Sequence, residues 1–161
     1  MPDSPVDAID RRILAALQED AHITMEKLAA RVGLSASPCA RRVRQLEAAG
    51  VIQRYVAVVD QEKVGLPISV FASIKLERQR EDELDRFERA IARWPEIVEC
   101  YLMTGQRDYL LRIVVKDLPA YEAFLKRTLT RLDGVASIES SFALSQVKHA
   151  QGLPVGGLPI D

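Results

Sequence analysis

The spacing of apolar residues divides the chain into a helical first part and a longer part of mixed strands and helices. In residues 1–50, apolar side chains recur every three or four positions, which is the period of an amphipathic helix. Helices are predicted over 8–19, over 25–32, and from Pro38 to just before Gly50. Asp7 and Thr24 are expected to cap the first two. Ser37 is expected to cap the third, with Pro38 at its first helical position.

After Gly50 the apolar period changes from that of a helix to that of a strand. Residues 51–60 (VIQRYVAVVD) are rich in β-branched side chains and predict a strand. Gly65 and Pro67 then mark a boundary. Further strands are predicted over 68–76, 97–103, 109–115 and 135–144, and helices over 81–93 and 118–132.

This order of elements predicts an α+β protein with two domains. The βαββαβ order is typical of a ferredoxin-like sandwich, in which two helices cover one face of an antiparallel sheet. We therefore expect a helix-turn-helix (winged-helix-like) domain over 1–50, a strand and linker over 51–67, and the sandwich domain over 68–161.

The second and third predicted helices have the form of a helix-turn-helix, joined by a short turn that contains Gly33. The third helix places Cys39, Val43 and Leu46 on one apolar face and its arginines on the others. In this motif the third helix enters the major groove, where arginine and glutamine reach phosphates and base edges. The candidate contacts to double-stranded DNA are Ser35, Ser37, Pro38, Arg41, Arg42, Arg44, Gln45 and Arg54.

The charge composition supports a local rather than a global nucleic-acid surface. The chain has 161 residues, of which 28% are charged, and its net charge is −1. This balance excludes a protein coated in positive charge. Positive charge is concentrated between Ser35 and Tyr55, where four arginines accompany a single acid, Glu47.

Cysteine and histidine usage argues against a metal site or a cofactor. Cys39 and Cys100 lack a CxxC partner, and His22 and His149 stand far apart. This excludes a zinc finger. No signal peptide and no membrane-spanning apolar run is visible, so we expect a cytoplasmic protein with two reduced, packed thiols.

Apolar runs in two predicted strands indicate a sheet that is buried on both faces. Residues 109–115 (YLLRIVV) and 70–74 (VFASI) are nearly continuous in apolar character. The two helices of the sandwich cover only one face. A second copy of the chain, forming a symmetric dimer, is the expected cover for the other. The Gly- and Pro-rich end of the tail, 152–161 (GLPVGGLPID), is expected to be loose unless it docks on a neighbour.

Four segments, in order and at the right spacing, resemble the Lrp/AsnC family of bacterial and archaeal regulators, also called feast/famine regulatory proteins. They are IDRRILAALQED, LAARVGLSASPCARRVRQLEAAGVI, TGQRDYLL and LTRLDGVASIESSFAL. The resemblance covers roughly residues 7–155. It implies dimers, often joined into octamers of four dimers, with amino acids bound between C-terminal domains of neighbouring dimers. The ending SSFALSQVKHAQGLPV is similar to a subgroup associated with amino-acid catabolism.

The resemblance also implies where an effector binds. Its contacts would come from the predicted hairpin, at Leu102, Met103, Thr104, Gly105, Asp108 and Tyr109, and from a facing strand, at Ser137, Ser140 and Phe142. Gly105 lets a ligand approach backbone N–H groups, which suit a carboxylate, and Asp108 suits an ammonium group. The alternative is an ordinary hairpin tip. Gln106 and Arg107 stand where many family members have an acidic or small residue, which leaves the effector's side-chain chemistry open.

Three functions follow from the sequence. The first is a DNA-binding transcriptional regulator that responds to an amino acid and controls genes of amino-acid metabolism. The second is a sensor or assembly module whose helix-turn-helix does not bind DNA. The third is an enzyme like the tetrapyrrole decarboxylases that resemble this family, which would be expected to use several His or Arg residues in one pocket. We identify no catalytic residue.

Overall fold

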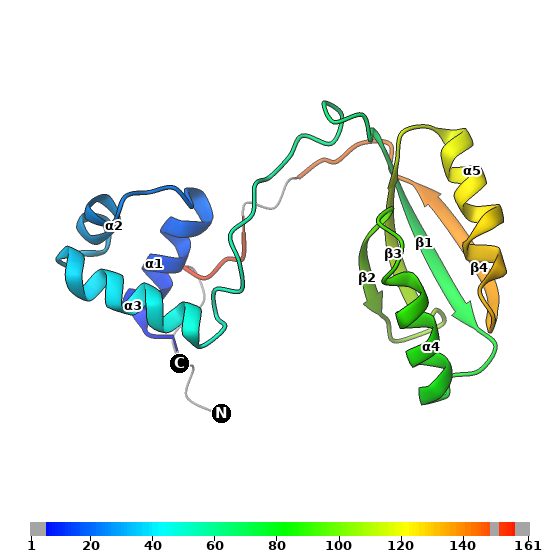
Figure 1. Ribbon diagram of the computed structural model, residues 1–161, viewed down its shortest axis with the longest axis horizontal. Helices are drawn as coiled ribbons and strands as arrows, with labels where there is room; N and C mark the ends of the chain where they lie inside the picture. The colour runs from blue at the N-terminus through cyan, green and yellow to red at the C-terminus, as the bar shows by residue number, and fades with distance from the viewer. Residues whose placement is uncertain (1–5, 149–151, 157–161) are drawn as a thin grey trace. The chain divides into compact units, whose positions relative to one another are not determined.

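The computed structural model describes residues 6–148 and 152–156 (Figure 1). The chain divides into two compact units. One takes the residues up to Ala57 together with those from Val147 onward, and the other takes Val58–Gln146. We refer to them as the DNA-binding unit and the effector unit.

The DNA-binding unit contains α1 (Ala8–Glu19), α2 (Met25–Val32) and α3 (Ala36–Ala48). The first two helices have their predicted bounds and caps. Asp7 accepts the N–H of Asp10, and Asp10 accepts the N–H of Asp7, which forms a reciprocal capping box. The three helices bury a common core of Ile13, Ala16, Leu28, Ala29, Val32, Cys39, Val43 and Leu46.

The start of α3 differs from the prediction. Ser35 is the N-cap, although its side chain forms no capping hydrogen bond, so the expectation of a cap at Ser37 is wrong. Pro38 is the third helical residue rather than the first. It is tolerated there because the N–H groups of the whole first turn lack helical partners. At the other end Gly50, at φ 71°, allows Val51 to donate to Leu46 and Gly50 to donate to Glu47, which closes the helix.

The strand predicted over 51–60 is absent, since residues 51–52 form a bend and residues 53–60 have no regular secondary structure. Val56, Val58 and Val59 are 65%, 95% and 60% exposed. A strand needs a hydrogen-bonded neighbour, and a single copy of the chain supplies none here. The segment therefore has the β-branched composition of a strand but no neighbouring strand to pair with.

The effector unit follows the predicted βαββαβ order. Its elements are β1 (Ile68–Leu76), α4 (Glu81–Ile91), β2 (Ile97–Leu102), β3 (Tyr109–Val115), α5 (Leu118–Arg127), a 3₁₀ turn η1 (Leu129–Arg131) and β4 (Val135–Phe142). The strands lie in the order β2-β3-β1-β4 and all neighbours are antiparallel. Both helices cover one face, as expected for the ferredoxin-like sandwich (Figure 1). The helix predicted over 118–132 breaks at Thr128 and resumes as η1.

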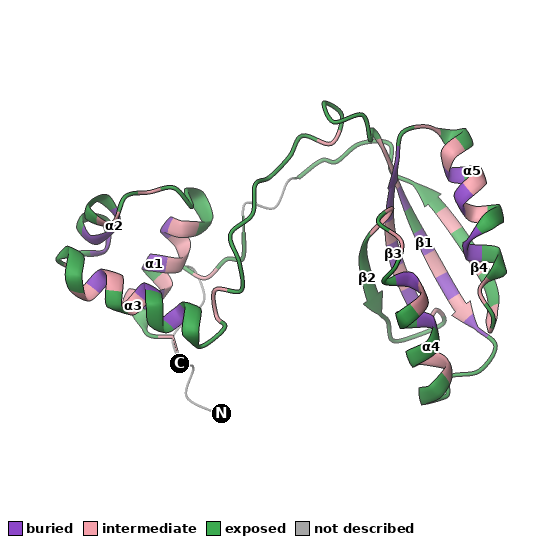
Figure 2. Cartoon of the chain, in the orientation of Figure 1, coloured by how far each residue is buried: buried purple, intermediate pink, exposed green. Residues whose placement is uncertain are grey.

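The core of this unit lies between the sheet and the two helices (Figure 2). Alternate residues of the central strands are buried, including Val70, Ala72 and Ile74 of β1. Phe87 of α4 and Phe124 of α5 pack against them. Burying each large side chain of this kind stabilises the fold by roughly 1.5–3 kcal/mol, so the core fixes which strand face is inward.

The opposite, open face of the sheet is mixed rather than continuously apolar. Phe71 and Tyr101 are 37% and 52% exposed on it. Arg112, within the apolar run of β3, pairs with Glu99 of β2 and also donates to Gln61. Although β3 is nearly continuous in apolar character, its side chains alternate between the two faces, and every second one points away from the helices.

The described part of the tail contacts the DNA-binding unit, a contact that the prediction of a domain over 68–161 did not include. Among the described residues, 147–148 and 152–156 group with the DNA-binding unit. The backbone N–H of Leu153 donates to Oε1 of Gln18 on α1 at 2.6 Å. Residues 152–156 therefore have a docking site on the chain itself, whereas the remaining part of the predicted loose tail lies outside the described residues. No helix in the described ranges is long and apolar enough to cross a membrane.

Candidate nucleic-acid interface and effector site

The face of α3 opposite its buried stripe carries most of the predicted DNA contacts. Ser37, Arg41, Arg44 and Gln45 are exposed, while Cys39, Val43 and Leu46 face the core. Neither Arg41 nor Arg44 forms an ion pair with any described residue. Because their charges are not neutralised within the unit, both guanidinium groups are available to an anionic partner.

Arg42 has a different role from its neighbours. Its Nη1 lies 2.7 Å from Oδ2 of Asp7 and 2.8 Å from Oδ1 of Asp10, and only 27% of its side chain is exposed. The hydrogen bonds to Asp10 and then Asp7 raise the pKa of Arg42 above its ordinary value. Arg42 therefore binds α3 to the start of α1, which is a structural role in addition to the DNA contact that the sequence predicted.

The remaining predicted DNA contacts lie at the two ends of α3. Ser35 is exposed at its N-terminus, where free N–H groups suit a phosphate, and Pro38 is half-buried in the first turn. Arg54 is exposed in the segment after the helix. Its neighbour Tyr55 donates through its hydroxyl to Glu47 of α3 at 2.9 Å, a contact that residue spacing did not predict.

The second candidate site lies at one end of the effector sheet. The β2–β3 hairpin, the β1–α4 connection and the η1–β4 turn all leave the sheet at this end. Leu102 and Met103 are 62% and 43% exposed, and Thr104 is exposed beside them. Gly105 has φ 107°, with no atom within 4 Å of where a Cβ would lie. The hairpin tip is therefore open to a ligand.

Asp108 is not the free ammonium acceptor that the sequence predicted. It is 5% exposed, and its carboxylate accepts the N–H of Leu76 at 2.7 Å, Nε2 of Gln79 at 2.6 Å and Nζ of Lys75 at 3.3 Å. Burial opposes ionisation, but these three donors outweigh it and leave the pKa of Asp108 below its ordinary value. Asp108 ties β3 to the end of β1.

Tyr109 is likewise part of the core rather than of a ligand surface. It is 1% exposed, and its ring lies 4.6 Å from that of Phe87, measured between centroids. Its hydroxyl donates to Oε1 of Glu88 at 2.8 Å. Burial and then Glu88 raise the pKa of Tyr109.

The three residues predicted on β4 lie on opposite faces of the sheet. Ser140 shares a hydrogen bond with the hydroxyl of Tyr121 on the helix-covered face. Phe142 stacks edge-on against the same Tyr121 ring, at 5.3 Å between centroids. Ser137 is on the open face. Strand alternation alone excludes a single wall made of all three.

Arg107 links the hairpin to β4 and was not predicted as a site residue. It donates to Oγ of Ser137 at 2.8 Å and to Oε2 of Glu139 at 2.6 Å. The structure therefore connects the hairpin to β4, and the connecting side chain is Arg107 rather than one of the predicted residues of the hairpin. The sequence signal was the unusual arginine at this position of the turn.

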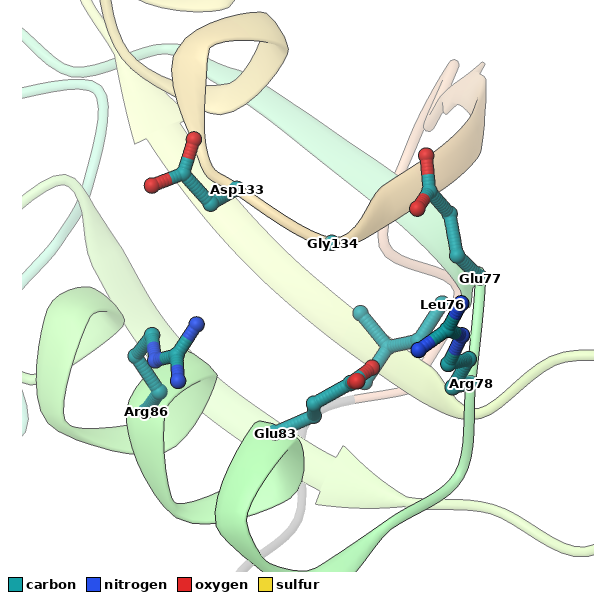
Figure 3. A pocket seen from close by; sticks show the side chains of 7 residues that line it. All are labelled: Leu76, Glu77, Arg78, Glu83, Arg86, Asp133 and Gly134. Carbon is teal, nitrogen blue, oxygen red and sulfur yellow. The ribbon is translucent and has the colours of Figure 1, made fainter.

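A polar cavity of about 270 Å³ opens at the same end of the sheet (Figure 3). Figure 3 shows Arg78, Arg86, Glu83 and Asp133 around it, with Gly134 at its rim. None of these four charged side chains forms an ion pair with a described residue. The cavity presents both signs of charge within a small volume.

A second, more apolar hollow of about 410 Å³ lies between α4 and β2, lined in part by Ile91, Val98 and Cys100. Cys100 is exposed, which corrects the prediction that its thiol is packed. Desolvation at this hollow, together with the charge of Glu88, raises the pKa of the Cys100 thiol to about 11. Cys39 is buried as predicted. No group of His, Cys, Asp and Glu in the described ranges is arranged to hold a metal ion.

Two family models match the chain along its length. A winged helix-turn-helix DNA-binding model matches residues 6–53, and the Lrp/AsnC ligand binding domain matches residues 69–153. The chain belongs to the Lrp/AsnC family. This membership agrees with the helix-turn-helix and the βαββαβ unit described above.

Individual relatives of this Lrp/AsnC protein are regulators. The Bkd operon transcriptional regulator of Pseudomonas aeruginosa is 50% identical over 150 residues, which are 93% of this chain and 98% of that protein. The leucine-responsive regulatory protein of Escherichia coli is 40% identical over 96% of this chain and 94% of its own length. The fold of the present chain resembles that of a transcriptional regulator from Neisseria meningitidis in complex with L-Met, with a TM-score of 0.88 and 38% sequence identity. The match covers 93% of this chain and 97% of that one.

These findings decide between the three functions that the sequence allowed. The chain is a DNA-binding transcriptional regulator of the Lrp/AsnC type. Its relatives are regulators and not enzymes.

Proposed function

We propose that this Lrp/AsnC regulator contacts DNA through the exposed face of α3 and that an amino acid bound at the hairpin end of the effector unit alters its DNA binding. The observation that carries the DNA surface is the contrast among three neighbouring arginines. Arg42 is neutralised by two aspartates, whereas Arg41 and Arg44 are exposed without a described partner.

The proposed DNA contacts follow from position on α3. Arg41, Arg44, Gln45 and Ser37 lie on the exposed face and have the length or polarity to reach phosphates and base edges. Ser35 and Pro38 stand at the N-terminal turn, where the helix attracts a phosphate. Arg54 adds a further exposed charge beyond the helix.

The proposed effector is an α-amino acid. The open N–H groups around Gly105 and the guanidinium of Arg107 suit its carboxylate. Because Asp108 is already saturated by three donors and Glu139 is paired with Arg107, the ammonium group needs another acid at this end of the sheet, and Asp133 is the candidate. Relatives named for leucine, or solved with L-Met, support an amino-acid ligand here.

Regulation of amino-acid metabolism genes in the cytoplasm is the corresponding biological role. The regulator named for the Bkd operon, together with the leucine-responsive relative, supports this assignment.

We further propose that the protein is a symmetric dimer, with an octamer of four dimers as the larger assembly. Segment 51–60 exposes Val56, Val58 and Val59 and has no strand partner in one copy. Antiparallel pairing with the same segment of a second copy would satisfy its backbone and bury those valines. Two copies would also present two α3 helices to two half-sites.

A scan of single amino acids by thermal shift tests the effector proposal. Purified protein is heated with each amino acid in turn, and selective binding raises the melting temperature because the ligand binds only the folded state. We expect a small subset of amino acids to stabilise the protein. A flat profile across the whole set would contradict an amino-acid effector.

A further inference from the structure

The side chain of Gln18 forms a two-point clasp on the backbone of Leu153. The N–H of Leu153 donates to Oε1 of Gln18 at 2.6 Å, and Nε2 of Gln18 donates to the carbonyl of Leu153 at 3.0 Å. Both polar groups of one peptide residue are thus satisfied by a single amide. In Figure 1 this segment, drawn red, lies beside α1.

The fit depends on backbone rather than on the Leu153 side chain, which is 75% exposed. Gly152 has φ 119°, and a Cβ added there would lie 2.5 Å from Oε1 and 2.6 Å from Cδ of Gln18. Gly156 then passes Ala15, with a Cβ there only in ordinary contact at 3.9 Å. Because Ala15 and Gln18 are three residues apart, they lie on one side of α1. Residues 152–156 therefore follow one helix face.

The contact between Gln18 and Leu153 lies where the chain returns from the effector unit to the DNA-binding unit. The chain leaves the DNA-binding unit after Ala57, forms the effector unit, and re-enters the DNA-binding unit at Val147. The effector unit is thus an insertion with two connections to the other unit. The clasp between Gln18 and Leu153 fixes the second connection eleven residues after β4 ends at Phe142.

The other end of α1 holds the recognition helix. Asp7 and Asp10 bind Arg42 of α3, and Gln18 lies two helical turns further along the same helix. A single helix of 12 residues therefore contacts both the tail that follows β4 and the helix that faces DNA.

We propose that residues 152–156 form a strap that binds the Ala15–Gln18 face of α1 and restrains the DNA-binding unit through a second attachment to the effector unit. Release of the strap leaves the two units joined only by the first connection. The inference uses the clasp, the Gly152 fit and the chain path, and it stands whether or not an amino acid is the effector.

Single-molecule energy transfer on the full chain tests the strap. One dye is placed on the exposed Cys100 and the other on E26C, at an exposed position of α2, while Cys39 stays buried. Labelled protomers are diluted into an excess of unlabelled protein, so that each assembly reports one pair of units. The width of the distance distribution measures the freedom between the two units.

Gln18→Ala and Gly152→Ala are the test variants. Gln18 is exposed, so its replacement leaves the core of the unit intact. Both variants are expected to broaden the distribution, and hydrogen exchange of the peptide that covers Leu153 is expected to rise about fivefold for each hydrogen bond lost. Gly156→Ala is the matched control and is expected to behave as the parent.

A truncation after Lys148 completes the test. It is expected to reproduce the broad distribution of Gln18→Ala, and Gln18→Ala in the truncated chain is expected to add nothing, since the two changes remove the same contact. A truncated chain with the parent's distribution would overturn the strap. So would a Leu153 peptide whose exchange is unchanged by Gln18→Ala.

Discussion

Arg42 of α3 and Asp10 of α1 form a hydrogen-bonded ion pair, with Nη1 2.8 Å from Oδ1. The aspartate is also the second half of the capping box that starts α1. The Asp10 carboxylate therefore both caps the start of α1 and binds α3 to it. This contact separates the arginines of α3 into one that holds the unit together and others that are free to bind DNA.

Replacement of Arg42 is expected to lower stability rather than to remove a DNA contact. Arg42→Ala leaves Asp7 and Asp10 without their cation, at a cost of about 1 kcal/mol after allowance for partial solvent exposure. Urea unfolding followed by far-UV circular dichroism measures it, while fluorescence of Trp94 reports the effector unit separately. Arg12→Ala, at an exposed position of α1, is the control. Unchanged stability of Arg42→Ala would show that the pair is not structural.

Arg44→Ala is expected to weaken DNA binding and to leave the stability of the fold unchanged. Its stability should match the parent because the side chain is exposed without a described partner. Its DNA affinity should fall about tenfold, and the slope of log K against log salt should become shallower by about 0.9, the value for one phosphate contact. Fluorescence anisotropy at several salt concentrations gives both quantities. Arg89→Ala on α4 controls for loss of a charge. DNA binding equal to the parent's would place the DNA surface elsewhere.

Asp108 predicts a dependence of stability on pH. Its folded-state pKa lies below the unfolded value of 3.8, so the carboxylate stabilises the fold above that pH, and the contribution is lost as the pH falls through the folded pKa. Asp108→Asn is expected to lose about 2 kcal/mol at neutral pH, because a buried N–H and two side-chain donors lose their charged acceptor.

Urea unfolding at neutral and at acidic pH measures this contribution. The difference between parent and Asp108→Asn should shrink as the pH falls below 3.8. Asp133→Asn, exposed at the same end of the sheet, is the control. A difference that is constant with pH would mean that the charge of Asp108 is not what stabilises β1 against β3.

Arg107 is expected to matter for the effector and little for the fold. Arg107→Gln removes the guanidinium that reaches Ser137 and Glu139, and we expect at least about tenfold weaker binding of the amino acid found in the thermal-shift scan, the loss typical of one charge-assisted contact. Isothermal titration calorimetry measures this loss. Gln106→Ala changes the adjacent, exposed side chain and should bind as the parent does. Equal affinity of Arg107→Gln would remove Arg107 from the site.

The limits of sequence reasoning are visible at particular residues. The bounds of β1 and β3 agree with prediction because apolar runs with strong turn signals at their ends define them locally. The structural contacts of Arg42 and Asp108 were not predicted because their partners, Asp10 and Leu76, lie 32 residues away along the chain. Spacing within a motif shows that a side chain is polar, but not whether another part of the fold has already satisfied it.

Two further differences have the same origin. The strand predicted over 51–60 has the right composition, but a strand is defined by pairing, which one chain does not provide here. The tail predicted to be loose contains Gly152, whose positive φ and close approach to Gln18 have no local sequence signature. Turns, caps and core positions are local properties, whereas docking and charge pairing are properties of the folded chain.

Selection of duplex DNA from a random pool by the purified protein, with and without a mixture of amino acids, tests the central claim most directly. We expect enrichment of a two-fold-related motif, whose half-site spacing reflects a dimer, and a change in recovery when the amino acids are present. No enriched motif under either condition would contradict sequence-specific DNA binding through α3. Equal recovery of the motif with and without the amino acids would contradict the proposed effector.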